Sequence, residues 1–222
     1  MNNQRLRKRA SGQGARKGSE YSAEKLMRAA LDLFSRSDYS TVTIKDIANA
    51  SAVNTALIYY YYDSKEDLFR AAIEFPINRA LERFSELREK HTEPVYLINE
   101  WFHSNLKSAN LIRQLVKIML DYSGSANRIA SVEKLIKKFY KVEEEHILAN
   151  SIERGIALGV FKKVDPITTA RFVSVHLDGI MVASMIRANF NIKTAILDLQ
   201  EILWCYLEYD AAKHLASRAR KK

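Results

Sequence analysis

The sequence predicts an all-α protein, and three observations carry that prediction. Only three prolines and seven glycines occur among 222 residues, which leaves few points for tight turns. Apolar residues recur at spacings of three and four over most of the chain, which is the period of a helix with one buried face. Residues that favour helix starts precede these segments, as at Thr43, Asn54 and Ser64. With 47% hydrophobic residues, the chain can also bury a sizeable core.

Two short helices are expected within residues 43–62. Thr43 can cap the first helix, and Asp46, three residues later, completes a capping-box pattern. Residues 51–53 form the turn, and Asn54 opens the second helix. Two helices connected in this way are a common device for laying one helix in the major groove of DNA.

Four consecutive tyrosines, at positions 59 to 62, complicate this interpretation because tyrosine favours strands. Capped and periodic segments flank the run on both sides, with Asn54 before it and Ser64 and Asp67 after it. We therefore expect the run to continue the second helix. Tyrosine side chains at that place can donate to phosphate oxygens or pack on bases and sugars.

Residues Leu26 to Ala72, about a fifth of the chain, resemble the DNA-binding domain of the TetR family of transcriptional regulators. The matching segments are Ala29–Phe34 with Tyr39, Thr43–Ala48, Val53, Leu57–Tyr62 and Ser64–Leu68. The chain departs from the family at three places. The family usually has glycine before Tyr39 and in the turn at Ala52, and it often has glycine or proline at the position of Ala56. Because only glycine adopts a positive φ freely, Ala52 predicts a turn without a left-handed residue at its position.

The resemblance implies that the chain binds a double-stranded DNA operator. Thr55, Ala56 and Tyr59 should face base edges, including thymine methyl groups, while Leu57, Ile58 and Tyr62 face the core. The full set of expected DNA-binding residues is Thr43, Lys45, Asn54, Thr55, Ala56, Tyr59, Tyr60, Tyr61 and Lys65. Within it, Thr43, Tyr60, Tyr61 and Lys65 are expected at phosphates. Packing against the first helix is the alternative for Tyr60 and Tyr61.

Positive charge is concentrated at the two ends of the chain. Residues 1–20 hold six basic residues and one acidic residue, and residues 213–222 hold five basic residues and no acidic one. The helix-turn-helix domain, expected over residues 21–75, holds six basic and eight acidic residues. We therefore expect the N-terminal tail to be flexible and to supply phosphate or minor-groove contacts. A solubilising role is the alternative for both tails.

Further helices follow from local start and stop signals. Ser22 should cap a first helix that packs behind the two short ones, and a long helix should run from Ser64 with a kink or break at Pro76. Residues 76–212 are expected to form a second helical domain. Within it, helices should start at Glu93-Pro94 and Asp165-Pro166, and one long helix should span residues 127–158 up to Gly159.

The segment from Ile167 to Ile186 carries apolar residues on nearly every side, so a partner is expected to cover one of its faces. By resemblance, this helix and the last one form a four-helix interface in a homodimer. A single large monomeric core is the alternative. The expected interface residues are Phe172, Val175, Gly179, Ala183, Leu199, Leu203 and Tyr206.

The resemblance also implies a small-molecule pocket in residues 76–212. Candidate polar groups are Trp101, His103, Arg113, Asp121, Tyr122, His146, Asn150, His176 and Asp178, although each is also an ordinary core or solvated residue. No metal or cofactor is expected, because the His and Cys spacing of a metal site is missing from the sequence.

The remaining patterns restrict the class of protein. The sequence has no nucleophile motif, phosphate loop or dinucleotide fingerprint, so an enzyme is not expected. The single Cys205 suits a reducing cytoplasm, and neither a signal peptide nor a membrane span is expected. We therefore expect a cytoplasmic dimeric repressor that a small molecule releases from its operator. The alternative is a DNA-bound protein whose C-terminal domain docks another protein without an inducer.

Overall fold

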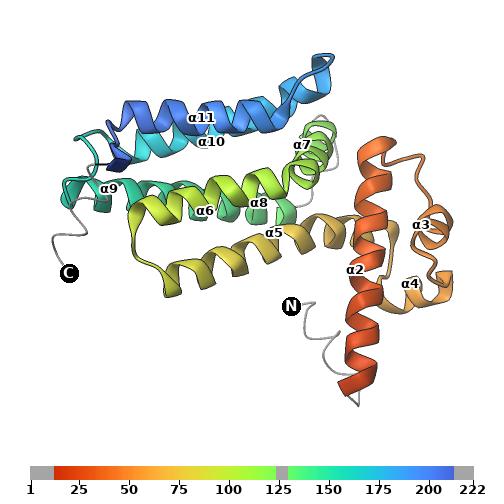
Figure 1. The fold of residues 1–222 in the computed structure, drawn as a ribbon. Helices are drawn as coiled ribbons and strands as arrows, with labels where there is room; N and C mark the ends of the chain where they lie inside the picture. The colour runs from red at the N-terminus through yellow and green to blue at the C-terminus, as the bar shows by residue number, and fades with distance from the viewer. Residues whose placement is uncertain (1–12, 124–129, 213–222) are drawn as a thin grey trace. The chain divides into compact units, whose positions relative to one another are not determined.

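The computed structural model describes residues 13–123 and 130–212, and within them the chain forms helices and connecting turns without a strand, which confirms the all-α prediction (Figure 1). In chain order the elements are α2 (Gln13–Arg36), α3 (Ile44–Ser51), α4 (Thr55–Tyr61), α5 (Lys65–Lys90), α6 (Pro94–Lys107), α7 (Ala109–Ser123), α8 (Ala130–Lys141), a π-helical segment η1 (Val142–Ala149), α9 (Asn150–Ala157), α10 (Pro166–Ile186) and α11 (Ile192–Tyr206). The described residues group into two compact units, the first of residues 13–78, 117–123 and 130–133 and the second of residues 79–116 and 134–212.

Helix α2 begins at Gln13, nine residues before the expected cap Ser22. Residues 13–20 are therefore helical, and the prediction of a flexible tail is wrong for them. The reason lies in composition, because Gln, Ala, Arg and Lys are good helix formers and continue the helix past Gly14 and Gly18. The rest of the expected N-terminal tail and the C-terminal tail, residues 1–12 and 213–222, lie outside the described residues.

The first unit is built by α2, α3 and α4, which pack on one another in sequence. Helix α2 buries one stripe, and Ile47 of α3 and Ile58 of α4 are fully buried beside it. Buried apolar residues of this unit are Leu26, Met27, Ala30, Leu31, Phe34, Val42, Ile44, Ile47, Ala48, Ile58, Leu68, Phe69, Ala72, Ile73, Ile77, Ile118, Tyr122 and Val132. The expected arrangement, in which the first helix packs behind the two short ones, is present.

The turn between α3 and α4 contains a left-handed residue at Ala52, with φ 52° and ψ 39°, so the prediction for this turn is wrong. The Ala52 amide donates to the carbonyl of Asn49, and the Val53 amide donates to the carbonyl of Ala48 at 3.0 Å. This is the Schellman pattern that ends helices, and it satisfies carbonyls that α3 leaves open. These hydrogen bonds hold alanine in a conformation that costs roughly 1–2 kcal/mol for a residue with a Cβ atom.

Helix α5 runs through Pro76 to Lys90, so of the kink or break predicted at this residue the break does not occur. A proline removes one backbone hydrogen bond of the helix. Ile73 and Ile77, on either side of Pro76, are both buried, and their packing stabilises the helix across that point.

The second unit surrounds a core formed by α6, η1, α9, α10 and α11, with α10 packed along η1 and α11 (Figure 1). Trp101 and Phe102 of α6 are fully buried in this core. The single helix expected over residues 127–158 runs without a gap from Ala130 to Ala157, with the π-helical stretch η1 between α8 and α9. Residues 127–129 lie outside the described residues. Gly159, with φ 69°, follows the end of α9 as expected.

The link after α9 is fixed by a close contact between Gly155 and Phe161. The amides of Val160 and Phe161 both donate to the Gly155 carbonyl, at 2.9 and 3.2 Å. The Phe161 ring lies 5.9 Å from the Trp204 ring and 6.0 Å from the Tyr209 ring. A Cβ atom on Gly155 would lie 2.1 Å from Cδ2 of Phe161, so only glycine fits here.

The outer faces of α10 and α11 carry exposed apolar side chains, although the set differs from the predicted interface. Leu199 and Leu203 are buried inside the chain, so assigning them to a dimer interface was wrong. Helical spacing alone could not show which side of α11 packs on α6. Phe172, Val175, Ile202 and Tyr206 are exposed, and nothing lies within 4 Å of a Cβ atom placed on Gly179. Ala183 is half-buried.

Replacing Gly155 by alanine should lower the free energy of unfolding by about 1–3 kcal/mol, because the new methyl group overlaps a buried ring. Chemical denaturation measures the effect. In a Phe161→Leu background the same substitution should cost less, since the overlapping ring atoms are gone. An equal cost in both backgrounds would show that the ring contact is not the cause.

Replacing Ala52 by glycine should raise the free energy of unfolding of the first unit by about 0.5–1 kcal/mol, since the left-handed penalty is removed and the greater entropy of the unfolded chain offsets part of the gain. Ala50→Gly is the matched control. Ala50 is exposed within α3, and glycine there should destabilise by about 1 kcal/mol. Destabilisation by both substitutions would contradict the left-handed turn.

Candidate nucleic-acid interface

Both short helices are capped by the predicted residues. Oγ1 of Thr43 accepts from the Asp46 amide at 3.1 Å, and a carboxylate oxygen of Asp46 accepts from the Thr43 amide at 2.9 Å. The Thr43 hydroxyl also donates to the Asp46 carboxylate, at 2.6 Å, and this bond, together with the one from the Thr43 amide, lowers the pKa of Asp46. Oδ1 of Asn54 accepts from the Ala56 amide at 2.8 Å. The caps fix where α3 and α4 begin, and therefore which side chains occupy the first turn of α4.

Helix α4 buries one side chain, Ile58, and leaves most of the others open. Tyr59 and Tyr60 are each more than half exposed, Ala56 is exposed and Thr55 is half-buried. Leu57 was expected in the core but is 38% exposed, because a helix of seven residues that packs through Ile58 has only a narrow buried side. The outer face of α4 therefore combines small, apolar and phenolic groups.

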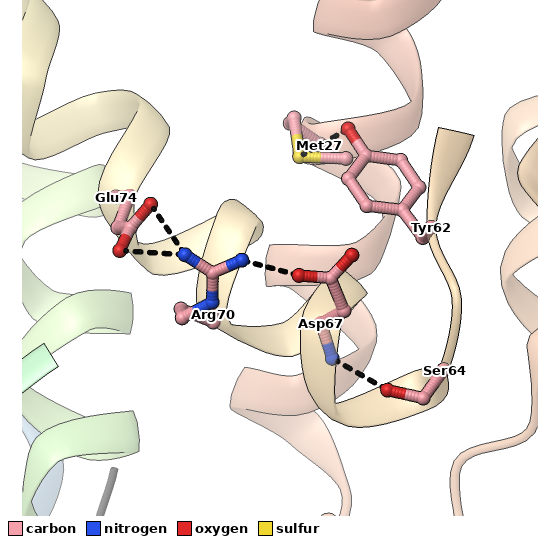
Figure 2. A network of polar contacts seen from close by, with 6 residues as sticks. All are labelled: Met27, Tyr62, Ser64, Asp67, Arg70 and Glu74. Atoms are coloured by element: carbon pink, nitrogen blue, oxygen red, sulfur yellow. Dashed lines mark hydrogen bonds and ion pairs between the residues drawn. The ribbon is translucent and has the colours of Figure 1, made fainter. Parts of the chain in front are cut away.

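The tyrosine run is helical up to Tyr61, as predicted, and Tyr62 is the extended C-cap residue. The rings of Tyr60 and Tyr61 lie 5.1 Å apart, nearly perpendicular. The hydroxyl of Tyr62 points to the sulfur of Met27 in α2 at 3.8 Å (Figure 2). Burial is the main cause that raises the pKa of Tyr62, to about 12. Tyr62 thus ties the end of α4 to α2, as expected for a residue that faces the core.

The first turns of α5 continue this framework (Figure 2). Oγ of Ser64 accepts from the Asp67 amide at 3.0 Å, which matches the predicted cap. Arg70 pairs with Asp67 and with Glu74, and the hydrogen bond to Asp67 is the main cause that raises the pKa of Arg70. Arg70 is therefore bound to carboxylates on its own helix and does not add positive charge to the face of α4.

Lys65, predicted as a phosphate contact, is hydrogen-bonded to backbone carbonyls in the structure. Its Nζ atom donates to the carbonyls of Tyr39, Ser40 and Val42, at 2.6, 3.3 and 3.0 Å. It also lies 4.3 Å from the centre of the Tyr39 ring. Three carbonyl oxygens can take all three N–H donors of an ammonium group. Sequence spacing could not reveal this, because the acceptors are backbone atoms more than 20 residues away. The expected cations Lys45 and Lys65 therefore differ, since Lys45 is exposed.

The predicted pocket residues differ in burial and are divided between the two units. His103, Asp121, His146, Asn150 and His176 are exposed, and Arg113 is half-buried. Tyr122 belongs to the first unit, where its ring lies 6.4 Å from the Phe69 ring. Trp101 is fully buried, and Asp178 is half-buried.

Trp101 and Asp178 instead belong to a buried polar cluster whose other members had no distinguishing pattern in the sequence. Nε1 of Trp101 donates to Glu143 at 3.0 Å, and Oγ of Ser174 donates to the same carboxylate at 3.4 Å. The Tyr140 hydroxyl donates to Asp178 at 2.9 Å. Glu143 stands first in a run of three glutamates, and such a run on a partly buried helix indicates that one of them points inward.

Burial governs the ionisation of this cluster. Desolvation, together with the charge of Asp178, raises the pKa of Glu143 to about 8. Desolvation is also the main cause that raises the pKa of Asp178 and of Tyr140. Glu143 is therefore mostly protonated at neutral pH, which keeps two neighbouring carboxyl groups from both being charged in the core.

Glu143→Gln should remove a pH dependence of stability. The native state keeps the Glu143 proton up to about pH 8, whereas the unfolded chain loses it near 4.5, so this residue lowers wild-type stability as pH rises between those values. The free energy of unfolding of the variant, relative to wild type, should therefore increase over that range and level off above pH 8. The exposed neighbour Glu145→Gln is the control, and parallel curves for the two variants would contradict the account.

Known proteins resemble this chain at two levels, in the sequence of the helix-turn-helix and in the fold. Residues 26–72 match the model of the bacterial regulatory proteins of the tetR family. The uncharacterized HTH-type transcriptional regulator YfiR of Bacillus subtilis is 25% identical over 158 residues, which cover 70% of this chain and 76% of that protein.

Two solved structures share the fold. One, a TetR transcription regulator from Haloarcula marismortui, has a TM-score of 0.67 at 23% identity and covers 85% of this chain and 97% of its own. The other, assigned as a transcriptional regulator from Saccharomonospora viridis and solved in complex with choline, has a TM-score of 0.68 at 19% identity and covers 83% and 96%. Residues 26–72, with their caps and open α4 face, are therefore a DNA-binding domain of the tetR family of bacterial regulatory proteins, and the helical domain that follows shares the fold of these two regulators.

Proposed function

We propose that the protein is a dimeric repressor that binds a near-palindromic operator and leaves it when a small molecule binds. The observation that carries this proposal is the capped α4, which buries only Ile58 and exposes Tyr59 and Tyr60. Such a face is shaped for the major groove, which admits a single helix.

Within this proposal, α4 reads bases through its first turns. Ala56 and Tyr59 lie on the exposed face, and Thr55 at the first helical position is half-buried. Their methyl and ring groups suit thymine methyls and the tyrosine hydroxyl suits polar base edges. Thr43, Lys45, Tyr60 and Tyr61 remain predicted backbone contacts, and the N-terminal tail remains a predicted source of further positive charge.

Dimerisation would cover the exposed apolar face of α10 and α11. Val175 and Ile202 are 58% and 57% exposed, and Phe172 and Tyr206 are similarly open. The empty space around Gly179 would let a partner helix approach closely. Two copies are also needed for specificity, because a two-fold protein contacts two half-sites about one helical turn apart.

Helix α10 is long and apolar enough to cross a membrane if only its length and composition are considered. Two features favour a protein partner over lipid. Arg171, His176 and Asp178 lie along the helix, and α10 packs on η1 and α11. Polar and charged groups at mid-helix are costly in a bilayer.

The effector would bind in the second unit. The similar structure from Saccharomonospora viridis holds choline, which supports a ligand-binding role for a domain of this fold. For this chain we propose a small molecule without naming its class.

Selection of bound duplexes from random DNA tests the proposal, followed by sedimentation and binding measurements on interface variants. Val175→Asp combined with Ile202→Asp should give monomers that bind the selected operator at least tenfold more weakly, because each half-site is then bound alone. Leu158→Asp is the control, since Leu158 is also 58% exposed and lies outside α10 and α11. Monomers with full operator affinity would contradict the proposal.

A compound screen on the operator complex then tests the release step. The proposal predicts that some small molecule frees the DNA. If only a protein partner alters operator binding, the C-terminal domain is a docking module, and the inducer part of the proposal is wrong.

A further inference from the structure

We infer that Lys65 is a positioning residue for the recognition helix: it clamps the segment before α3 and does not contact DNA. The inference rests on the proposed DNA-binding function, and it assigns Lys65 a role different from the phosphate contact that the family resemblance implied.

The clamp joins two ends of the helix-turn-helix. Nζ of Lys65, the first residue of α5, donates to the carbonyls of Tyr39, Ser40 and Val42, at 2.6, 3.3 and 3.0 Å. The segment that it holds leads directly into the Thr43 cap of α3. The ammonium group of Lys65 therefore connects the residue that follows segment 43–64 to the residues that precede it.

A local turn presents these carbonyls. The Asp38 carbonyl accepts from the Thr41 amide at 3.0 Å and from the Thr41 hydroxyl at 2.9 Å. The Val42 amide is directed at the same oxygen, at 3.4 Å. With the amides turned inward to Asp38, the carbonyls of the turn are open to an external donor, and Lys65 supplies it.

The position of Lys65 in α5 supports the same conclusion. A cation in the first turn of a helix opposes the helix dipole, which favours acids there, as at Glu66 and Asp67. Lys65 is the first residue of α5, where its positive charge is unfavourable to the dipole of that helix. Three carbonyl oxygens directed at the ammonium group offset that unfavourable placement.

Aromatic packing makes the clamped segment stiff. The Tyr39 ring lies 5.8 Å from the Phe34 ring and 4.9 Å from the Phe69 ring, and Lys65 covers it at 4.3 Å. Phe34 and Phe69 are themselves buried. Lys65 is therefore hydrogen-bonded to a segment that is itself packed on buried rings. These contacts tie the position of α3 to that of α5.

Lys65→Arg and Lys65→Met separate this role from a phosphate contact. A planar guanidinium binds phosphate as well as an ammonium does, but it does not match three carbonyls that surround one nitrogen. If Lys65 is a clamp, both variants should bind the selected operator at least tenfold more weakly. Their affinity for random DNA and their slope of log affinity against log salt should match wild type.

A phosphate contact gives the opposite pattern. Lys65→Arg would then bind like wild type, while Lys65→Met would weaken operator and random DNA alike and flatten the salt slope by about 0.9 for each phosphate that is no longer neutralised. That result would overturn the inference. Lys45→Met is the control, since Lys45 is exposed and is expected to behave as a direct DNA contact.

Amide hydrogen exchange on the free protein tests the clamp without DNA. The amides of residues 46–48, which are hydrogen-bonded in the first turn of α3, should exchange at least tenfold faster in Lys65→Met, while those of α10 stay unchanged. Equal exchange in α3 would overturn the inference even if DNA binding fell. If the wild-type protein selects no duplex, the proposed function fails, and exchange still decides whether the clamp exists. If Lys65→Met does not fold, Lys65→Gln, which keeps two donors, replaces it in both experiments.

Discussion

The orientation of α4 depends on contacts made outside that helix. It spans only Thr55–Tyr61 and buries one side chain, and isolated helices of that length are not stable in water. The cap residue Asn54 sets the start of α4, and the Tyr62 hydroxyl, which contacts the Met27 sulfur, holds its end. Lys65 connects the start of α5 to the segment that precedes α3. A helix held at both ends can expose nearly all of its side chains to a partner. The first unit is organised around that requirement.

Much of this unit is predictable from sequence because its signals are local. Capping depends on residues two or three positions apart, so Thr43 with Asp46, Asn54, and Ser64 with Asp67 could be identified from the order of residues alone. The conformation of Ala52 and the partners of Lys65 could not be predicted. In the first case two backbone hydrogen bonds outweigh the preference of alanine, and in the second the acceptors converge only after folding.

The second unit is less predictable, because helical periodicity shows which face of a helix is buried but does not show whether that face packs on the same chain or on a partner. The pattern of α11 placed Leu199 and Leu203 on an apolar side, and the structure uses that side for its own core. Likewise, three consecutive glutamates looked equivalent, and the π-helical segment η1 turned Glu143 inward to Trp101 and Ser174.

The central claim is that α4 enters the major groove of two half-sites. Methylation interference with dimethyl sulfate tests it most directly, because this reagent modifies guanine N7 in the major groove and adenine N3 in the minor groove. On the selected operator, the account predicts two patches of guanine N7 interference about one helical turn apart, both weakened by Tyr59→Ala. Interference confined to adenine N3, or a pattern that Tyr59→Ala leaves unchanged, would contradict it.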